Sequence, residues 1–302
     1  QPPRLQMTAP WISDRILVTG SGGRLGSEIR RLFGARATAA DLPELDLTDR
    51  ESVRRVVSRC RPRLVINTAA YTHVDRAESE PDLCWEVNLR GVERLVEACR
   101  QAGAALVQIS TDYVFDGRKR SAYLESDEPN PLSTYGRSKL EAERVAAELS
   151  NHLIVRTAGL FGPAGPASRG SFVETILRLA EGGKPIRVVS DRFASPTYTC
   201  DLARAIESLL RAGATGTYHV VNAGAATWHE MAVEILRLAG RQAVVAPVLC
   251  GDYPSAAARP RFSVLATRKY DQTPGRFPMP DWRTALAAYL APGGRVQADD
   301  HV

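Results

Sequence analysis

Short apolar runs alternate with segments of helical periodicity through the first half of the chain. Each run spans only a few residues, is rich in Val, Ile, Leu or Ala, and is followed by glycine or polar residues. Continuous apolar runs of this length are typical of strands buried on both faces of a parallel sheet. The predicted strands are Arg15–Thr19, Ala37–Ala40, Arg63–Asn67, Ala105–Ser110 and Leu153–Arg156.

The segments between these runs place apolar residues three or four positions apart, which is the period of an amphipathic helix. Thr48–Cys60 opens with a Thr-Asp-Arg-Glu pattern that favours a helix start. The other predicted helices of this half follow Gly26 or span Asn88–Ala102 and Tyr135–Glu148. Strands and helices that alternate with short connections predict an α/β fold with a Rossmann-type, doubly wound parallel sheet.

Beyond about residue 160, the predicted strands and helices alternate less regularly. The elements predicted there are a Gly/Pro-rich loop at Pro163–Gly170, helices at Phe172–Glu181, Asp201–Arg211 and Thr227–Gly240, and a strand at Ile186–Val189. We therefore expect a first domain over 15–160 and a smaller, partly interleaved α/β substrate-binding lobe over 161–290. The polar ends, 1–14 and 291–302, are expected to be flexible.

Composition narrows the class of protein. The 302 residues are 44% hydrophobic and 24% charged, which excludes a mainly disordered chain. No apolar run approaches the roughly 20 residues of a membrane span. The net charge is +5, but Arg alternates with Asp and Glu throughout, so the balance favours a small anionic substrate over nucleic acid. The five cysteines form no CxxC pair and no His cluster accompanies them, which predicts reduced thiols in a cytoplasm and no metal site.

A glycine-rich turn follows the first predicted strand. Gly20, Gly23 and Gly26 fit GxxGxxG, a variant of the dinucleotide-binding fingerprint. In that fingerprint the glycines allow a tight turn, a close approach of the pyrophosphate and close helix–strand packing. The N-terminus of the next helix then offers free N–H groups to the phosphates.

Acidic and basic residues near this turn bear on the choice of cofactor. Asp41 ends the second strand, 21 residues past Gly20, where an acid can bond the adenosine ribose and favour NADH. Arg24, inside the loop, could instead hold the 2′-phosphate of NADPH, so both cofactors stay open. Asp46 is placed equally well for an adenine contact and for a turn or cap.

Tyr135 and Lys139 stand four residues apart and share one helix face, with Cβ atoms roughly 6 Å apart. Reduction of a ketone by a nicotinamide needs an acid for the carbonyl oxygen, and the pKa of free tyrosine, about 10, is too high at neutral pH. A neighbouring ammonium would lower that pKa. Thr111 ends the fourth strand and could bind the same substrate oxygen. The alternatives are an exposed Tyr–Lys pair and a threonine that caps a strand end.

Seven segments resemble the dTDP-4-dehydrorhamnose reductase family of the extended short-chain dehydrogenase/reductase superfamily. They are VINTAAYTHVDRAESEP (65–81), QISTDYVFDG (108–117), YGRSKLEAE (135–143), SDRFASPT (190–197), GTYHVVNAGAATWHEMA (216–232), YPSAAARP (253–260) and MPDW (279–282). The resemblance covers nearly the whole chain from Arg15 to about Leu290. It implies reduction of the C4 keto group of a dTDP-4-keto-6-deoxyhexose by NADPH or NADH.

The resemblance also implies residue roles. Cofactor contacts are implied for Gly20, Gly23, Arg24, Leu25, Gly26, Asp41, Asp46, Leu47, Ala69, Ala70, Tyr71, Thr72, Tyr135 and Lys139. Tyr135 is implied as the catalytic acid, Lys139 as a ribose ligand, and Thr111 and Asp112 as residues that face the sugar. Arg259 is implied as a diphosphate partner, the alternative being a surface arginine.

One residue departs from the resemblance. The family usually carries tryptophan where Gly159 follows the Arg156-Thr157-Ala158 run. Loss of a large aromatic side chain predicts an opened or reshaped sugar pocket. We therefore expect a substrate other than the ordinary rhamnose precursor.

Two other classes stay open at this stage. A non-catalytic regulatory subunit of the methionine adenosyltransferase type resembles the same branch and would show no turnover. A sugar-nucleotide epimerase or dehydratase would retain and recycle its nicotinamide. Some family members dimerise through Mg²⁺-bound acids that we do not locate here, so a homodimer stays open.

Overall fold

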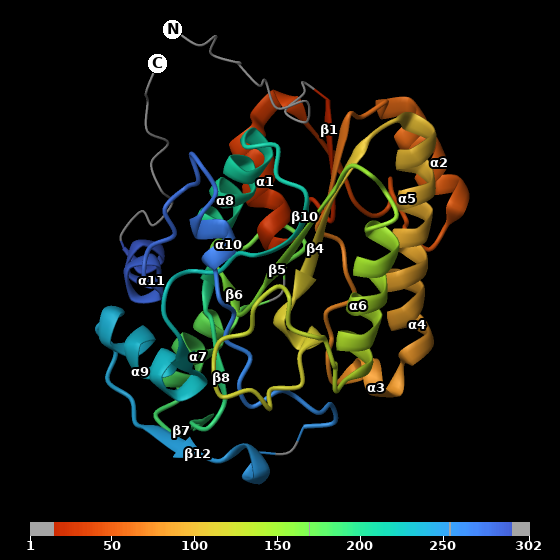
Figure 1. Ribbon diagram of the computed structural model, residues 1–302. Helices are drawn as coiled ribbons and strands as arrows, with labels where there is room; N and C mark the ends of the chain where they lie inside the picture. Colours follow the sequence, from red (N-terminus) through yellow and green to blue (C-terminus); the bar gives the residue numbers. More distant parts are fainter. Residues whose placement is uncertain (1–14, 169, 254, 292–302) are drawn as a thin grey trace, which may run out of the picture.

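The computed structural model describes residues 15–168, 170–253 and 255–291. Its centre is a six-stranded, all-parallel sheet in the order β10-β5-β4-β3-β1-β2 (Figure 1). The strands are β1 (Ile16–Thr19), β2 (Ala37–Ala40), β3 (Leu64–Asn67), β4 (Ala105–Thr111), β5 (His152–Thr157) and β10 (Gly216–His219). The doubly wound fold class predicted from the sequence is thereby confirmed. The chain order reverses between β1 and β3, and in such sheets ligands bind outside the carboxyl ends of the strands at this reversal.

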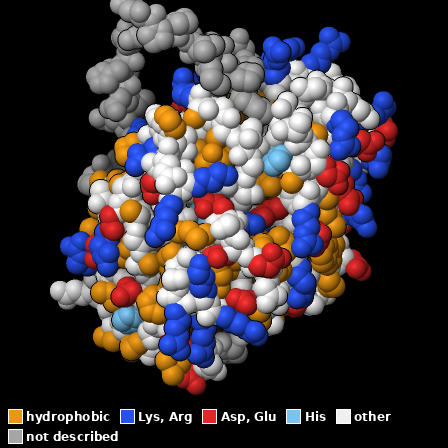
Figure 2. Space-filling model, viewed as in Figure 1, with side chains coloured by type: hydrophobic (Ala, Val, Ile, Leu, Met, Phe, Trp, Pro, Cys, Tyr) orange, Lys and Arg blue, Asp and Glu red, His pale blue; other side chains and the backbone are white. Residues whose placement is uncertain are grey.

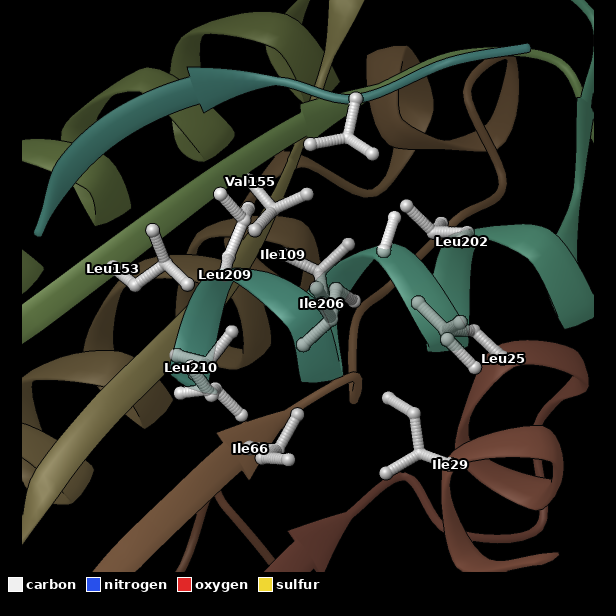
Figure 3. Packing of buried hydrophobic residues seen from close by; sticks show 14 of the residues in the cluster. Leu25, Ile29, Ile66, Ile109, Leu153, Val155, Leu202, Ile206, Leu209 and Leu210 are labelled. Atoms are coloured by element: carbon white, nitrogen blue, oxygen red, sulfur yellow. The ribbon is translucent and has the colours of Figure 1, made fainter. Parts of the chain in front are cut away.

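Helices cover both faces of the sheet because successive strand residues point to opposite sides. Side chains from alternate positions of the strands pack against α1 (Arg24–Phe33) and α8 (Thr199–Arg211). Figure 3 shows Leu202, Ile206 and Leu209 of α8 lying over the sheet. The intervening positions pack against α2 (Arg50–Cys60), α5 (Gly91–Ala102) and α6 (Thr134–Ala146). Every residue of β1, β3 and β4 is buried, as the apolar runs predicted.

The remaining elements of the chain are short or belong to the smaller lobe. They are α3 (Arg76–Ser79), α4 (Pro81–Trp85), β6 (Leu160–Phe161), α7 (Phe172–Ala180), β7 (Ile186–Val189), β8 (Phe193–Ala194), β9 (Thr197–Tyr198), β11 (Ala226–Thr227), α9 (Trp228–Leu238), β12 (Val245–Val248), α10 (Arg268–Asp271) and α11 (Trp282–Leu290). In Figure 1, α7, α9 and α11 lie together with β7 and β12 at one end of the molecule, and their apolar side chains form a separate core cluster. The division of the chain at residue 160 stays a prediction, although α8 and β10 return from beyond it to the central sheet.

Two predicted helix starts differ from the structure. The N-cap of α2 is Asp49, whose carboxylate accepts from the Glu51 N–H at 2.9 Å, so the helix begins after the predicted Thr48. The segment predicted as one helix from Asn88 begins instead with a π-helical turn, Glu86–Arg90. Hydrophobic periodicity does not reveal a π turn, because the apolar face continues through it into α5.

The surface carries the mixture of basic and acidic side chains that the sequence predicts. Figure 2 shows basic and acidic side chains interspersed over the visible face. Among the described helices, none combines the length and hydrophobicity that crossing a bilayer requires. All five cysteines are free thiols. Of the ends predicted to be flexible, 1–14 and 291–302, all residues except Ala291 lie outside the described residues.

Candidate active site

The glycine-rich turn joins β1 to α1 at the point where the strand order reverses. The Gly23 N–H donates to the Gly20 carbonyl oxygen at 2.9 Å, and α1 begins at the next residue without a side-chain cap. A Cβ on Gly26 would lie 2.3 Å from the Gly20 carbonyl oxygen and 2.9 Å from the Ser21 Cα. Only glycine allows this approach of helix to turn. The uncapped helix N-terminus and the exposed turn backbone fit the phosphates of a dinucleotide.

Asp41 reaches the turn from the end of β2. Its two carboxylate oxygens accept from the Gly22 N–H at 2.9 Å and from the Leu42 N–H at 3.0 Å. The loop after β6 lies against the same turn, because the Ala167 N–H donates to the Gly22 carbonyl oxygen at 2.9 Å. Asp41 therefore lies where the sequence predicts that the adenosine binds, and its hydrogen bond with Gly22 also fixes the turn.

Arg24 faces the smaller lobe. Its guanidinium pairs with the Glu174 carboxylate of α7 at 3.0 Å and donates to the Gly162 carbonyl oxygen. Tyr289 of α11 donates to the same carboxylate at 3.2 Å. The side chain predicted for a pyrophosphate or 2′-phosphate role thus links α1 to the other lobe.

The two residues predicted beside the adenosine have structural partners. Asp46 accepts from the N–H and the hydroxyl of Thr48 at 2.8 and 2.7 Å, so the turn role that the sequence left open is present. Leu47 is buried in the core under α2 and α5. Leu25 is likewise a core residue, on the opposite face of the sheet.

The segment Ala69–Thr72 follows β3 and is held in place by a residue that the sequence did not single out. Asn88, in the π turn, accepts from the Tyr71 N–H at 2.8 Å and donates to the Tyr71 carbonyl oxygen at 3.1 Å. It also donates to the Ser138 hydroxyl of α6 at 3.0 Å. The π turn therefore joins the predicted nicotinamide side to the helix that carries Tyr135. The only sequence signal for it was the polar residue inside a helical pattern.

Thr111 and Tyr135 meet where β4 ends and α6 begins. The Thr111 hydroxyl lies near enough to the Tyr135 hydroxyl to act on its pKa, which it lowers. Thr111 also accepts from the Tyr113 N–H at 3.2 Å, which orients its side chain. Tyr135 is half-buried at this place.

Lys139 lies one turn further along α6 and is buried. Its ammonium donates to the Ile109 carbonyl oxygen at 2.7 Å, and burial lowers the pKa of Lys139 to about 8. The expectation that Lys139 lowers the pKa of Tyr135 is wrong for this structure. Burial, with the nearby Asp112 carboxylate, raises the pKa of Tyr135 above its ordinary value. The phenol is therefore held in its protonated, proton-donating form.

Asp112 is buried between the lobes. It accepts from the Ser263 hydroxyl at 2.5 Å and from the Thr111 hydroxyl at 3.1 Å. Burial raises the pKa of Asp112 to about 6, although these hydrogen bonds oppose the shift. The pKa of this carboxyl group is higher in the folded state than in the unfolded state. Its ionisation therefore lowers the stability of the fold as pH rises through the interval between the two pKa values.

Asp112→Asn is therefore expected to gain stability relative to the wild type between pH 5 and pH 7.5. The relative gain is about 1–2 kcal/mol, because the variant has no carboxylate to ionise in the buried site. Thermal denaturation at the two pH values measures it, and any pH-independent loss of hydrogen bonding cancels in the comparison.

Asp116→Asn is the matched control for this prediction. Burial of Asp116 is outweighed by hydrogen bonds from Arg118, Asn130 and Tyr123, so the pKa of Asp116 is lowered. Its replacement should lose stability, or leave it unchanged, over the same pH interval. An equal effect of the Asp112 substitution at both pH values would show that its carboxylate is not perturbed.

Arg259 approaches the site from the smaller lobe. Both of its terminal nitrogens donate to the Asp75 carboxylate, at 2.8 and 2.7 Å, and this hydrogen bonding lowers the pKa of Asp75 to about 2. Arg259 also lies close enough to Tyr113 for the two side chains to interact electrostatically, and the Tyr113 ring meets that of Tyr135 edge-on at 6.1 Å between centroids. The structure thus brings Arg259 to the phenol side of the site and pairs it with a carboxylate there.

Gly159 follows β5 in a left-handed conformation, with φ of +54°. A Cβ at this position would lie 3.2 Å from the Pro196 Cα, so a side chain is disfavoured by conformation and by space. Gly159, Ala194, Pro196 and Met231 line a small apolar hollow, and Trp228 supplies its aromatic wall. Among the described residues, no group of three or more His, Cys, Asp or Glu side chains is placed to hold a metal ion.

Comparisons with known proteins agree with this geometry. The family model described as RmlD substrate binding domain matches residues 14–294. A dTDP-4-dehydrorhamnose reductase of Streptomyces griseus is 40% identical over 92% of this chain and 93% of its own length. A dTDP-4-keto-6-deoxy-D-glucose reductase of Streptomyces niveus is 38% identical over 91% and 96%.

Solved structures give the same result. The crystal structure of dTDP-4-dehydrorhamnose reductase from Bacillus anthracis in complex with NADP superposes with a TM-score of 0.87 at 36% identity, over 92% of this chain and 99% of that one. Sequence and fold therefore agree, and the chain belongs to the dTDP-4-dehydrorhamnose reductase family.

Proposed function

We propose that this chain catalyses the NAD(P)H-dependent reduction of the C4 keto group of a dTDP-4-keto-6-deoxyhexose. It is an oxidoreductase of the sugar-nucleotide reductase type, by its membership of the family. The observation that carries the proposal is the meeting of Thr111, Tyr135 and Lys139 at the carboxyl edge of β4. This edge is where doubly wound sheets bind their ligands.

The proposed chemistry assigns one task to each residue. A bound NAD(P)H, held by the glycine-rich turn and the Asp41 edge, would supply the hydride equivalent. Tyr135 donates its phenolic proton to the C4 oxygen, and its raised pKa keeps that proton in place until charge develops on the oxygen. The hydroxyl of Thr111 binds the same oxygen. Lys139 binds the nicotinamide ribose.

The cofactor is proposed as NADPH or NADH. The related Bacillus anthracis structure contains NADP. In this chain Asp41 supports a ribose with free hydroxyls, whereas Arg24, which could meet a 2′-phosphate, is paired with Glu174. Steady-state rates with each cofactor at equal concentration test the preference.

The proposed sugar is a 4-keto-6-deoxyhexose other than the ordinary rhamnose precursor. Its support is Gly159, which stands where the resemblance leads us to expect tryptophan and where a Cβ would lie 3.2 Å from the Pro196 Cα, and Trp228, which lines the same hollow. The relatives named above differ in their sugars, dehydrorhamnose in one and 4-keto-6-deoxy-D-glucose in the other. Comparison of kcat/KM for the two dTDP sugars is the test, and full efficiency on dTDP-4-dehydrorhamnose would contradict this part of the proposal.

Stoichiometric loss of NAD(P)H absorbance on addition of a dTDP-4-keto sugar tests the reductase proposal itself. A chain that converts the sugar without net consumption of NAD(P)H would be an epimerase. A chain that binds cofactor but turns over no sugar would be a regulatory subunit. The five free thiols support a cytoplasmic location, and a homodimer is proposed on the resemblance alone.

A further inference from the structure

Three consecutive residues at the end of β4 face three residues on one side of α6. The Ile109 carbonyl oxygen accepts from Lys139, and Thr111 lies close enough to Tyr135 to lower its pKa. Between them, the Ser110 hydroxyl donates to the Glu143 carboxylate at 2.5 Å. The helix residues are spaced four apart, so they follow one face of α6. Glu143 thus completes a row whose other two members are the proposed acid and its lysine.

Glu143 is itself fixed from behind by Arg156 of β5. The Arg156 guanidinium donates to both carboxylate oxygens, at distances of 2.7–3.2 Å, and both side chains are about 95% buried. The guanidinium also lies over the Phe115 ring, 5.2 Å from its centroid. A buried, bidentate pair of this kind has few alternative geometries, so it fixes the position of α6 relative to the central sheet.

We propose that Glu143 is a positioning residue whose carboxylate, anchored by Arg156 and Ser110, holds Lys139 charged and in place for the cofactor ribose. This inference depends on the proposed function in one respect, namely that Lys139 binds the cofactor ribose. Ion pairs between a buried arginine and a buried glutamate contribute little net stability, because desolvation offsets their attraction. A positioning task therefore explains the pair better than stability does.

The charges around Lys139 support this assignment. Burial lowers the pKa of Lys139, and the Glu143 carboxylate is the larger of the two charges that oppose burial. The other is Cys84 of α4, which is a neutral thiol because burial raises its pKa. On the side of Lys139 that faces β4, its ammonium donates to the neutral Ile109 carbonyl oxygen.

The far side of the pair carries one more titratable group. His219 of β10 lies 3.5 Å from Arg156, and burial, with the adjacent arginine, lowers the pKa of His219 to about 3. It is therefore neutral throughout the pH range in which Lys139 titrates. Glu143 is then the residue whose charge can shift the titration of Lys139.

The test is the pH dependence of the dissociation constant for NADPH, measured by fluorescence on the purified chain without any sugar. The wild type should bind tightly up to about pH 8, where Lys139 loses its proton. Glu143→Gln should bind like the wild type near pH 6, about threefold more weakly at pH 7.5 and close to tenfold more weakly at pH 9. These factors correspond to a fall of about one unit in the pKa of Lys139.

Three further variants make the result specific. Glu141→Gln makes the same change on the exposed side of α6, where Glu141 pairs with Arg144, and should leave the profile unchanged. Glu143→Asp keeps the charge and should restore much of the affinity at pH 7.5. Because Glu143→Gln leaves Arg156 buried without its partner, the double variant with Arg156→Met provides a folded alternative. It should shift in the same acid direction by a smaller amount, because a buried positive charge is removed together with the negative one.

An unchanged profile in Glu143→Gln, or an equal loss of affinity at every pH, would overturn the inference. The first would show that Lys139 does not need Glu143, and the second that the role is structural. A wild type that binds no NADPH would instead refute the proposed function. The two failures are therefore distinguishable.

Discussion

Tyr135→Phe is expected to lower kcat by about 10²–10⁴-fold, the usual contribution of a positioned general acid. The substitution removes one oxygen and leaves the ring, so its edge-on packing against Tyr113 is kept. The affinity for NADPH should change little, because the glycine-rich turn and Lys139 are untouched. Single-turnover absorbance with a dTDP-4-keto sugar measures the loss in the chemical step.

Tyr123→Phe provides the matched control for this experiment. The Tyr123 hydroxyl is also hydrogen-bonded, to Asp116 at 2.9 Å, but its ring stacks on Phe115 in the core. Its removal should affect stability and leave kcat near the wild-type value. If Tyr135→Phe retained wild-type turnover, the proton would have to come from another group, and the proposed mechanism would fail.

The pKa of Tyr135 shows where sequence reasoning about chemistry needs the structure. The spacing of Tyr135 and Lys139 predicts that they share a helix face, and α6 confirms it. The spacing cannot show that Lys139 is bonded to the Ile109 carbonyl oxygen or that Asp112 lies beside the phenol. Burial and a neighbouring carboxylate therefore decide the direction of the shift. That direction favours a proton donor, which is the form that a reductase uses.

The central sheet was predictable because its signal is local. Runs such as 15–19 and 105–110 are continuous and apolar, and a parallel strand covered on both faces requires little else. The glycine-rich turn was equally local, since the motif and its strand–helix setting are contiguous. These two features were enough to predict the edge of the sheet at which we propose that the ligands bind.

The contacts between the lobes were not predictable, because they join residues that lie far apart in the sequence. Glu174 pairs with Arg24 and Asp75 pairs with Arg259. Ser263 donates to Asp112 across the same boundary. Each is an ordinary polar residue in its own segment, and only the folded chain shows its partner. Such pairs also explain why two predicted ligand-binding arginines have protein partners.

Gly26→Val is expected to weaken NADPH binding by about 100-fold or more. The added Cβ would lie 2.3 Å from the Gly20 carbonyl oxygen and 2.8 Å from the Thr68 hydroxyl. The first of these atoms belongs to the backbone of the turn, so the turn must move away from α1. That movement misaligns the N–H groups that the phosphates require, and the overpacking itself costs about 1–3 kcal/mol of stability.

Fluorescence titration with NADPH, together with a thermal melt, measures both effects. Gly251→Val is the control, because a Cβ on Gly251 meets no atom within 4 Å and should change neither quantity. If Gly26→Val does not fold, Gly26→Ala places the same Cβ with less bulk and should show a smaller loss in the same direction. Wild-type affinity in a folded Gly26 variant would mean that the dinucleotide does not lie on this turn. The cofactor contacts proposed around the turn would then fail as well, since Asp41 and Thr68 are both hydrogen-bonded to it.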